Sequence, residues 1–207
     1  MRRAPILLAA GLAAAAATVT VTATAIDADG GSSKRATLRL ADGTSIGTVR
    51  FYDEHDGHVR VKVDLDVPED TTATRAFHGF HVHANDNPAN GDGCVADPAM
   101  PAATWFVSAD GHLAGDGVGH GNHAGDMPSL HLNTDGSAEA TFSTERFAVR
   151  DLTGKVVILH AGPDNFGNVP VGTTPTQYQP NSQEALDRTA ATGNAGDRVA
   201  CGVIGRR

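Results

Sequence analysis

The chain has 207 residues, of which 40% are hydrophobic, so it is long enough to form one domain with a short extension. It contains 24 acidic and 16 basic residues, and its formal net charge is −8 at pH 7. This negative balance argues against nucleic acid or an anionic membrane surface as a binding partner.

The first 25 residues have the pattern of a secretory signal peptide. Arg2 and Arg3 form a positive n-region, residues 6–19 form an apolar h-region, and Ala-Thr-Ala at 23–25 is a small-residue cleavage pattern. We therefore predict cleavage after Ala25 and a secreted or cell-envelope protein that keeps no membrane segment. An uncleaved membrane anchor is the alternative, but the alanine-rich composition of this segment favours the signal peptide.

Residues 26–34 are polar and rich in glycine, which predicts a flexible lead-in to a single domain over residues 35–207. Within that domain, polar and apolar residues alternate in short runs, most clearly at Val59–Val67. Only Gln183–Thr189 suggests a helical turn. The pattern predicts an all-β sandwich or barrel of about eight strands. The expected strands are Arg35–Leu40, Ile46–Tyr52, Val59–Val67, Phe80–His83, Ser129–Leu132, Ala138–Phe142, Val156–His160 and Val199–Ile204.

Two long stretches, residues 84–127 and 161–198, lack the strand pattern. Structureless loops of this length are uncommon in compact domains and usually have a function. Both stretches flank candidate metal ligands, so we expect loops that fold over a site. Trp105 and Phe106 are expected to anchor one loop in the core, and His78 is expected to brace a loop.

His81 and His83 lie in the predicted strand Phe80–His83. Residues i and i+2 of a strand point to the same face, so both imidazoles would project to one side. Two such imidazoles form half of a site for copper or zinc. The same pair also occurs on ordinary polar strand faces, so this alternative stays open here. His160 ends another predicted strand and could reach the pair.

A glycine-rich stretch contains His112, His120, His123 and Asp126. It has no hydrophobic period, which predicts a loop that something other than a core must order. Three imidazoles and one carboxylate are a ligand set suited to tetrahedral zinc. The stretch therefore predicts a zinc site.

Cys94 and Cys201 are the two cysteines of the chain. In a protein that leaves the reducing cytoplasm, a disulfide between them is expected, and two free thiols are the alternative. The bridge would tie the loop after His83 to the strand Val199–Ile204.

Four motifs, in this order, resemble the secreted bacterial copper/zinc superoxide dismutases, those of actinobacteria among them. The motifs are His-Gly-Phe-His-Val-His at 78–83, the zinc loop that ends at Gly125-Asp126, His-Ala-Gly-Pro-Asp-Asn at 160–165, and the glycine-rich run at 193–205. The resemblance covers roughly residues 34–207.

The resemblance implies an eight-stranded antiparallel Greek-key β-barrel with one copper and one zinc ion per subunit. It implies copper ligands His81, His83, His112 and His160. It implies zinc ligands His112, His120, His123 and Asp126, so that His112 bridges both ions. Asp164 would be the carboxylate that links a copper histidine to a zinc histidine, although an Asp in such a turn otherwise indicates only a turn former. The short His120–His123 spacing departs from many family members.

The implied activity is conversion of superoxide to dioxygen and hydrogen peroxide by copper that cycles between Cu(II) and Cu(I), which protects the cell exterior. His112 would take up a proton when it leaves copper. Arg198 would bind the anionic substrate, because a guanidinium stays charged; a surface Arg198 paired with Asp197 is the alternative. Residues 161–197 contain no lysine, so Arg188 is the expected source of any electrostatic steering.

Two other functions are compatible with this fold: a copper-binding or copper-delivery domain without catalysis, and a structural cell-envelope domain with a vestigial site. The complete ligand set together with Arg198 favours the enzyme. The resemblance also allows a homodimer, because secreted bacterial family members occur as monomers and as dimers.

Overall fold

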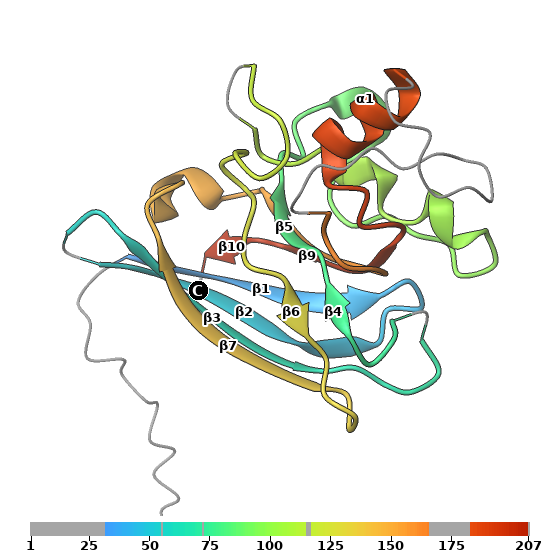
Figure 1. Cartoon of the computed structure of the whole chain (residues 1–207). Coiled ribbons are helices and arrows are strands. Elements are labelled where there is room, and N and C mark those ends of the chain that lie inside the picture. Colours follow the sequence, from blue (N-terminus) through green and yellow to red (C-terminus); the bar gives the residue numbers. More distant parts are fainter. Residues whose placement is uncertain (1–31, 55, 72, 115–116, 166–182, 207) are drawn as a thin grey trace, which may run out of the picture. The chain divides into compact units, whose positions relative to one another are not determined.

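The computed structural model describes residues 32–206 apart from 55, 72, 115–116 and 166–182. The predicted signal peptide, residues 1–25, lies outside the described residues. The strands are β1 (Ser33–Leu40), β2 (Ser45–Asp53), β3 (Val59–Asp66), β4 (Phe77–His78), β5 (Phe80–His83), β6 (Leu130–His131), β7 (Ser137–Thr144), β8 (Val156–His160), β9 (Arg198–Val203) and β10 (Gly205–Arg206). One α-helix, α1 (Gln183–Thr192), is present among the described residues (Figure 1).

The strands form a curled antiparallel sheet in the order β5-β8-β9-β1-β2-β3-β7, with β10 also paired to β1 (Figure 1). Strands β4 and β6 form a separate two-stranded sheet. Neighbours such as β3 and β7, or β5 and β8, are far apart in the chain, as in a Greek-key arrangement. All eight predicted strands and the all-β class are confirmed. Strand β1 begins two residues earlier than predicted, at Ser33, and β4 and β10 are additional short strands.

Strand β3 shows why these segments become strands. Its apolar residues at odd positions, from Val59 to Leu65, are buried, whereas most of the intervening polar residues face solvent. Alternation of this kind buries one face of a sheet against a core and leaves the other face wet. Phe51 of β2 and Leu38 of β1 pack in the same cluster and are fully buried.

Strands β5 and β8 differ from β3 because they are buried on both faces. Phe80 and Val82 point into the main core. Residue His81 is paired with Ile158 of β8, and Ile158 belongs to a second, smaller core on the opposite face. The two histidines of β5 therefore lie on a face that is covered by protein.

The cover consists mainly of the segment between β5 and β6, which contains the short 3-10 helices Pro88–Asn90, Ala102–Thr104 and Val107–Ala109. Phe106 is buried in the second core and Trp105 packs against it, as predicted. The disulfide between Cys94 and Cys201 joins this segment to β9 across a sequence separation of 107 residues. The predicted disulfide is thus confirmed.

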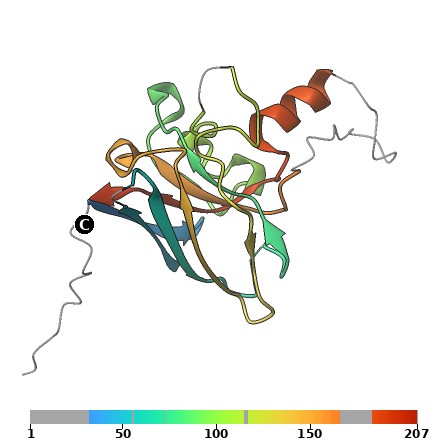
Figure 2. The same cartoon turned by 60° about the vertical axis from the view of Figure 1, so that its left-hand side comes forward.

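The second long stretch, residues 161–198, contains α1, which is longer than the helical turn predicted at Gln183–Thr189. Helix α1 packs beside the loops and is not part of the antiparallel sheet (Figure 2). None of the helices in the described part of the chain has the length and apolar character needed to cross a lipid bilayer.

Replacing Cys94 and Cys201 together by serine is expected to lower the free energy of unfolding of the metal-free protein by about 4–5 kcal/mol, because a bridge that closes so long a loop restricts the unfolded chain. Urea denaturation of the metal-free wild type and the double variant measures this difference. Reduction of the wild-type disulfide should give the same loss. A loss below about 1 kcal/mol would contradict the stabilising role assigned to the bridge.

Candidate metal centre

One edge of β5 pairs with β8, and the other edge is covered by the loop between β5 and β6. Val82 donates its N–H to the carbonyl of Gly125 (2.8 Å) and accepts from the N–H of Leu113 (2.8 Å). Two isolated antiparallel bridges place His81 opposite Asp126 and His83 opposite His112. Residues directly opposite in such a pair have neighbouring side chains. The pairing of this loop with β5 therefore brings loop ligands to strand ligands.

Gly125 permits the close approach of the loop. A Cβ atom at this position would lie 2.1 Å from the carbonyl oxygen of Val82, which is far inside van der Waals contact. Gly79 has a similar role below the site, where a Cβ would lie 2.8 Å from Asp164 Oδ1 and 3.0 Å from the His81 ring. Gly79 thus allows Asp164 and His81 to pack closely against the backbone of β4 and β5.

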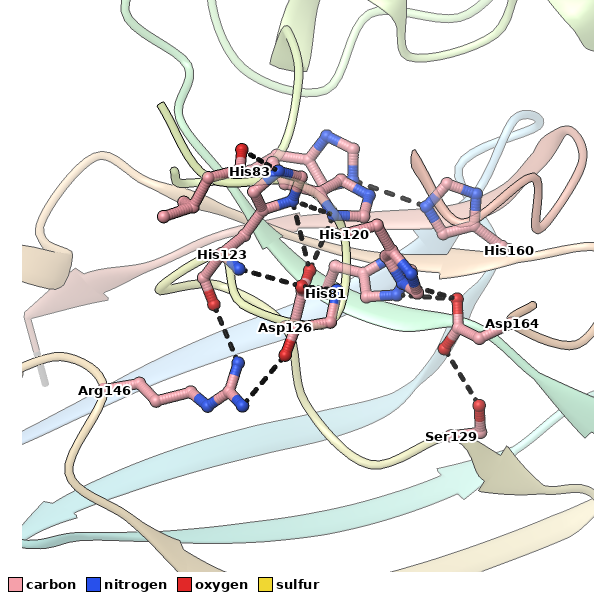
Figure 3. Close-up of polar contacts among 12 residues, drawn as sticks. His81, His83, His120, His123, Asp126, Ser129, Arg146, His160 and Asp164 are labelled. Carbon is pink, nitrogen blue, oxygen red and sulfur yellow. Dashed lines mark hydrogen bonds and ion pairs between the residues drawn. The ribbon is translucent and has the colours of Figure 1, made fainter. Parts of the chain in front are cut away.

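Four histidines from three segments converge in one buried cluster (Figure 3). His81 and His83 come from β5, His160 comes from the end of β8, and His112 comes from the loop. One ring nitrogen from each lies within 4.8 Å of the others. His83 Nε2 and His160 Nε2, for example, are 3.4 Å apart. The four residues are those predicted for copper.

A second cluster shares two of these residues. One donor atom from each of His81, His112, His120 and Asp126 also lies within 4.8 Å of the others. His123, which was predicted for zinc, borders this cluster. Its Nδ1 lies 3.3 Å from His112 Nδ1 and 3.5 Å from Asp126 Oδ1. The four residues predicted for zinc are therefore neighbours, although His81 rather than His123 belongs to the tightest group.

In three of the six rings, the outer nitrogen is held by a backbone carbonyl. His83 Nδ1 donates to the carbonyl of Asp110 (2.9 Å), His160 Nδ1 to that of Gly196 (3.2 Å), and His123 Nε2 to that of Val118 (3.2 Å). A carbonyl only accepts, so these contacts fix which nitrogen carries the proton and leave the other nitrogen as a lone-pair donor. Metal-binding histidines are oriented in this way.

Asp164 holds two further rings. Its Oδ1 lies 2.9 Å from His81 Nε2 and 3.3 Å from His120 Nε2 (Figure 3). The other oxygen, Oδ2, accepts a hydrogen bond from Ser129 Oγ (2.9 Å). The Asp164 carboxylate thus orients His81, which belongs to both clusters, and His120, which belongs to the second. No sequence pattern pointed to Ser129, because its contact depends on how the loop before β6 passes the turn at Asp164.

The cluster also leaves nitrogens that a metal would satisfy. His81 Nδ1 and His112 Nε2 are buried and have no hydrogen-bond partner among the described residues. Buried polar atoms in native proteins nearly always have a partner, and an exception calls for an explanation such as a bound ion. Neutral imidazoles with one carboxylate are donors that suit copper and zinc. The residues therefore fit both ions.

The protonation states also suit metal binding. Burial lowers the pKa of His83 and of His160, and the positive charge of Arg198 nearby lowers both further. Burial lowers the pKa of His112 to about 4, against the opposing effect of Asp126. Burial alone would raise the pKa of Asp126, but the hydrogen bond with His112 and the neighbouring histidines lower it to about 2. The three imidazoles are thus neutral at pH 7 and the carboxylate is ionised.

Arg198 lies at the start of β9, beside this cluster. Its guanidinium donates to the carbonyls of Phe106 and Asp110, so it does not follow the alternative in which it pairs with Asp197 at the surface. Asp110 has a positive φ of 63°, unusual for a residue other than glycine. Its carboxylate accepts from the backbone N–H of Asp86 (2.7 Å) and of Asn87 (2.8 Å), which supports that conformation. The sequence alone did not point to Asp110.

Helix α1 supports the site from a second side. The backbone N–H of His120 donates to the carbonyl of Ala190 in α1 (2.7 Å). Arg188 also lies in α1, but its side chain lies outside the described part of the structure. His78 does not join the cluster: its Nδ1 and Nε2 contact the carbonyls of His160 (2.8 Å) and Thr74 (2.7 Å).

A curled antiparallel sheet with two overlapping clusters of buried histidines fits the class of copper/zinc proteins, and the comparisons with known proteins agree. The model of the copper/zinc superoxide dismutase (SODC) family matches residues 45–204. The chain belongs to this family, whose members are oxidoreductases that use copper and zinc.

Three relatives illustrate the relationship. The superoxide dismutase [Cu-Zn] of Mycolicibacterium paratuberculosis is 35% identical over 176 residues, which cover 81% of this chain and 72% of that protein. The corresponding protein of Mycobacterium tuberculosis is 35% identical over 191 residues, or 86% of this chain and 72% of that one. The corresponding protein of Schizosaccharomyces pombe is 32% identical over 175 residues, or 83% and 97%.

Two solved structures share the fold at lower identity. The clock protein EA4 has a TM-score of 0.59 and 22% identity, and the match covers 86% of this chain and 96% of that one. A double mutant of a superoxide-dismutase-like protein from Bacillus subtilis has a TM-score of 0.57 and 20% identity, with 82% and 95% covered.

The metal-free protein is expected to lose stability as the pH falls from about 6.5 toward 4. The folded-state pKa values of His83, His112 and His160 lie below the unfolded value of about 6.5, so in this range the unfolded chain binds more protons than the folded one. Each well-separated group contributes a slope of up to about 1.4 kcal/mol per pH unit. Urea denaturation of metal-free protein from pH 7.5 to 4.5 measures this.

A His112→Asn variant has one of these groups fewer and is expected to show a shallower decline. A stability of the metal-free wild type that does not change between pH 7 and pH 5 would contradict the assignment of buried neutral imidazoles.

Proposed function

We propose that this chain is a superoxide dismutase whose copper is held by His81, His83, His112 and His160. Its zinc is held by His112, His120, His123 and Asp126. The observation that carries the proposal is the pair of overlapping buried clusters, which share His81 and His112. One ring has two nitrogens, so a shared histidine can serve both clusters at once. Bound copper supplies one-electron redox chemistry, and bound zinc supplies a fixed positive charge.

His112 has the contacts needed to hold a proton during turnover. Its Nδ1 lies 2.8 Å from Asp126 Oδ1, on the side of the second cluster. Its Nε2 is buried and has no hydrogen-bond partner among the described residues. Nε2 can therefore accept and give up a proton while Asp126 keeps the ring in place. Asp164, through Oδ1, keeps His81 and His120 oriented at the same time.

Arg198 binds the anionic substrate in this proposal. Its guanidinium is fixed by two carbonyls of the covering loop and lies close enough to His83 and His160 to lower their pKa values. A guanidinium is weakly hydrated and stays charged at any physiological pH, so it attracts a small anion well. Superoxide is such an anion.

We further propose that residues 1–25 are a signal peptide cleaved after Ala25, that the residues from 26 to the start of β1 at Ser33 lead into the domain, and that the mature protein acts outside the cytoplasm. The Cys94–Cys201 disulfide supports an oxidising location. The family resemblance allows both a monomer and a homodimer, and light scattering on the mature protein distinguishes them.

A His81→Ala variant is expected to lose copper and with it at least about 99% of the dismutase activity, because His81 is fully buried in both clusters and nothing else supplies its nitrogen. Inhibition of cytochrome c reduction by superoxide measures activity, and elemental analysis measures copper. The control is His131→Ala, which removes an exposed histidine of β6. Equal activity of His81→Ala and wild type would eliminate the proposal. Full copper loading of an inactive wild type would favour a copper-binding domain instead.

An Arg198→Gln variant is expected to keep its copper but to lose roughly 10–100-fold in kcat/KM. A hydrogen bond to a charged group contributes about 1.5–3 kcal/mol, and about 1.4 kcal/mol corresponds to a factor of ten. Binding of azide, followed by the copper absorption spectrum, should weaken in parallel. Arg150→Gln, which removes a solvent-exposed arginine, is the control. Unchanged azide affinity in Arg198→Gln would refute the anion-binding role.

A further inference from the structure

Arg146 follows the end of β7 and reaches the part of the β5–β6 loop that carries His120, His123 and Asp126. Its Nη1 donates to the carbonyl of His123 (3.0 Å) and its Nη2 to the carbonyl of Gly121 (3.0 Å). In the close-up, Arg146 and His160 lie on opposite sides of the cluster (Figure 3). The guanidinium therefore contacts the zinc-side loop and not the copper-side residues.

The turn from Gly121 to His123 is held from its inner side as well. Asp126 Oδ2 accepts hydrogen bonds from the backbone N–H of Gly121 (2.6 Å) and of His123 (3.0 Å). Gly121 and His123 thus each donate a backbone N–H to the Asp126 carboxylate and each accept a hydrogen bond from the Arg146 guanidinium at the carbonyl. Movement of this turn away from the cluster would break both sets of contacts.

A surface pocket lies beside this turn. It has a volume of about 340 Å³, and its walls include His120, Asp126, Phe142 and Arg146. Water or a chelator in this pocket would approach two of the candidate zinc ligands from outside the cluster. Arg146 is itself exposed, so its two hydrogen bonds stand at the boundary between solvent and the ligand-bearing loop.

We propose that Arg146 is a positioning residue that latches the Gly121–His123 turn over the zinc site and thereby slows the loss of zinc. The proposal rests on the proposed function, because it takes His120, His123 and Asp126 as zinc ligands. The planar guanidinium can donate to both carbonyls at once from a fixed fork, which a lysine ammonium on a flexible stem cannot do equally well. Groups that orient metal ligands in this indirect way commonly change metal affinity by about 10–100-fold when they are removed.

The direction in which replacement of Arg146 changes the rate of zinc release distinguishes the latch from a purely electrostatic effect of its charge. Arg146 carries a positive charge near the place of a divalent cation, so its charge alone would favour zinc loss. Removing only that charge should then slow zinc release. A latch predicts the opposite, because removal frees the turn and should speed release.

The test uses the copper- and zinc-loaded full mature protein at pH 7.5 with a large excess of a chromogenic zinc chelator. Wild type is compared with Arg146→Met, Arg146→Lys and the control Arg150→Met. Arg150 lies nearby in the sequence, and its side chain is 83% exposed with a single distant carboxylate neighbour, Asp151, at 3.7 Å. The measured quantity is the rate of zinc release, with copper content and circular dichroism followed in parallel.

The expected result is a release rate at least about ten-fold higher in Arg146→Met, intermediate in Arg146→Lys and unchanged in Arg150→Met, with copper retained in all four proteins. The visible spectrum of Co²⁺ placed in the zinc site should also change in Arg146→Met and not in Arg150→Met. If Arg146→Met does not fold, Arg146→Lys alone decides, since it keeps the charge but loses the fork.

Zinc release from Arg146→Met or Arg146→Lys at or below the wild-type rate would overturn the latch while leaving the proposed function intact. Equal acceleration in Arg150→Met would also overturn it. A wild-type protein that binds copper but no zinc would overturn the zinc assignment itself, and the latch with it.

Discussion

The burial of six imidazoles in one cluster is the constraint on which the rest of this structure depends. His81, His83, His112, His120, His123 and His160 are each at most 5% exposed. A polar ring buried without partners destabilises a fold by several kcal/mol, so each ring needs partners for its nitrogens. Three backbone carbonyls, from Asp110, Val118 and Gly196, and the carboxylates of Asp126 and Asp164 lie against the outer nitrogens. The inner nitrogens that remain converge, and a bound ion would satisfy several of them at once.

That requirement explains features of the fold that lie outside the site. Strands β5 and β8 must be covered on both faces, because one face holds Phe80 and Val82 in the main core and the other holds the histidines. The described residues of the covering segment form no strand, so a small second core and the disulfide hold it in place. Glycine at 125 lets the loop approach β5 closely enough to pair with it. The contacts that hold the covering segment in place therefore also position the loop ligands against β5.

Much of this arrangement could be predicted from the sequence. The alternation of apolar residues located the strands, and the two-residue period placed His81 and His83 on one face. The position of His160 at the end of a strand suggested its role. Asp164 was identified only through resemblance to a family, because an aspartate in a turn has no distinctive pattern. The family is now established by the match over residues 45–204.

Other parts could not be predicted, for a physical reason. Ser129, Asp110 and Arg146 act through contacts between loops, and the path of a loop depends on tertiary pairing rather than on a local period. The bridge between His83 and His112 is one such pairing, across 29 positions of the chain. His81, rather than His123, belongs to the second cluster. This difference depends on side-chain positions within a few ångströms, which a sequence pattern does not determine.

The most direct test of the shared-histidine centre is a crystal structure of the metal-loaded protein with anomalous scattering recorded at both the copper and the zinc absorption edges. The account predicts two separate peaks: copper beside His81, His83 and His160, zinc beside His120, His123 and Asp126, with the His112 ring between them. A single peak, or a copper peak away from His112, would contradict it.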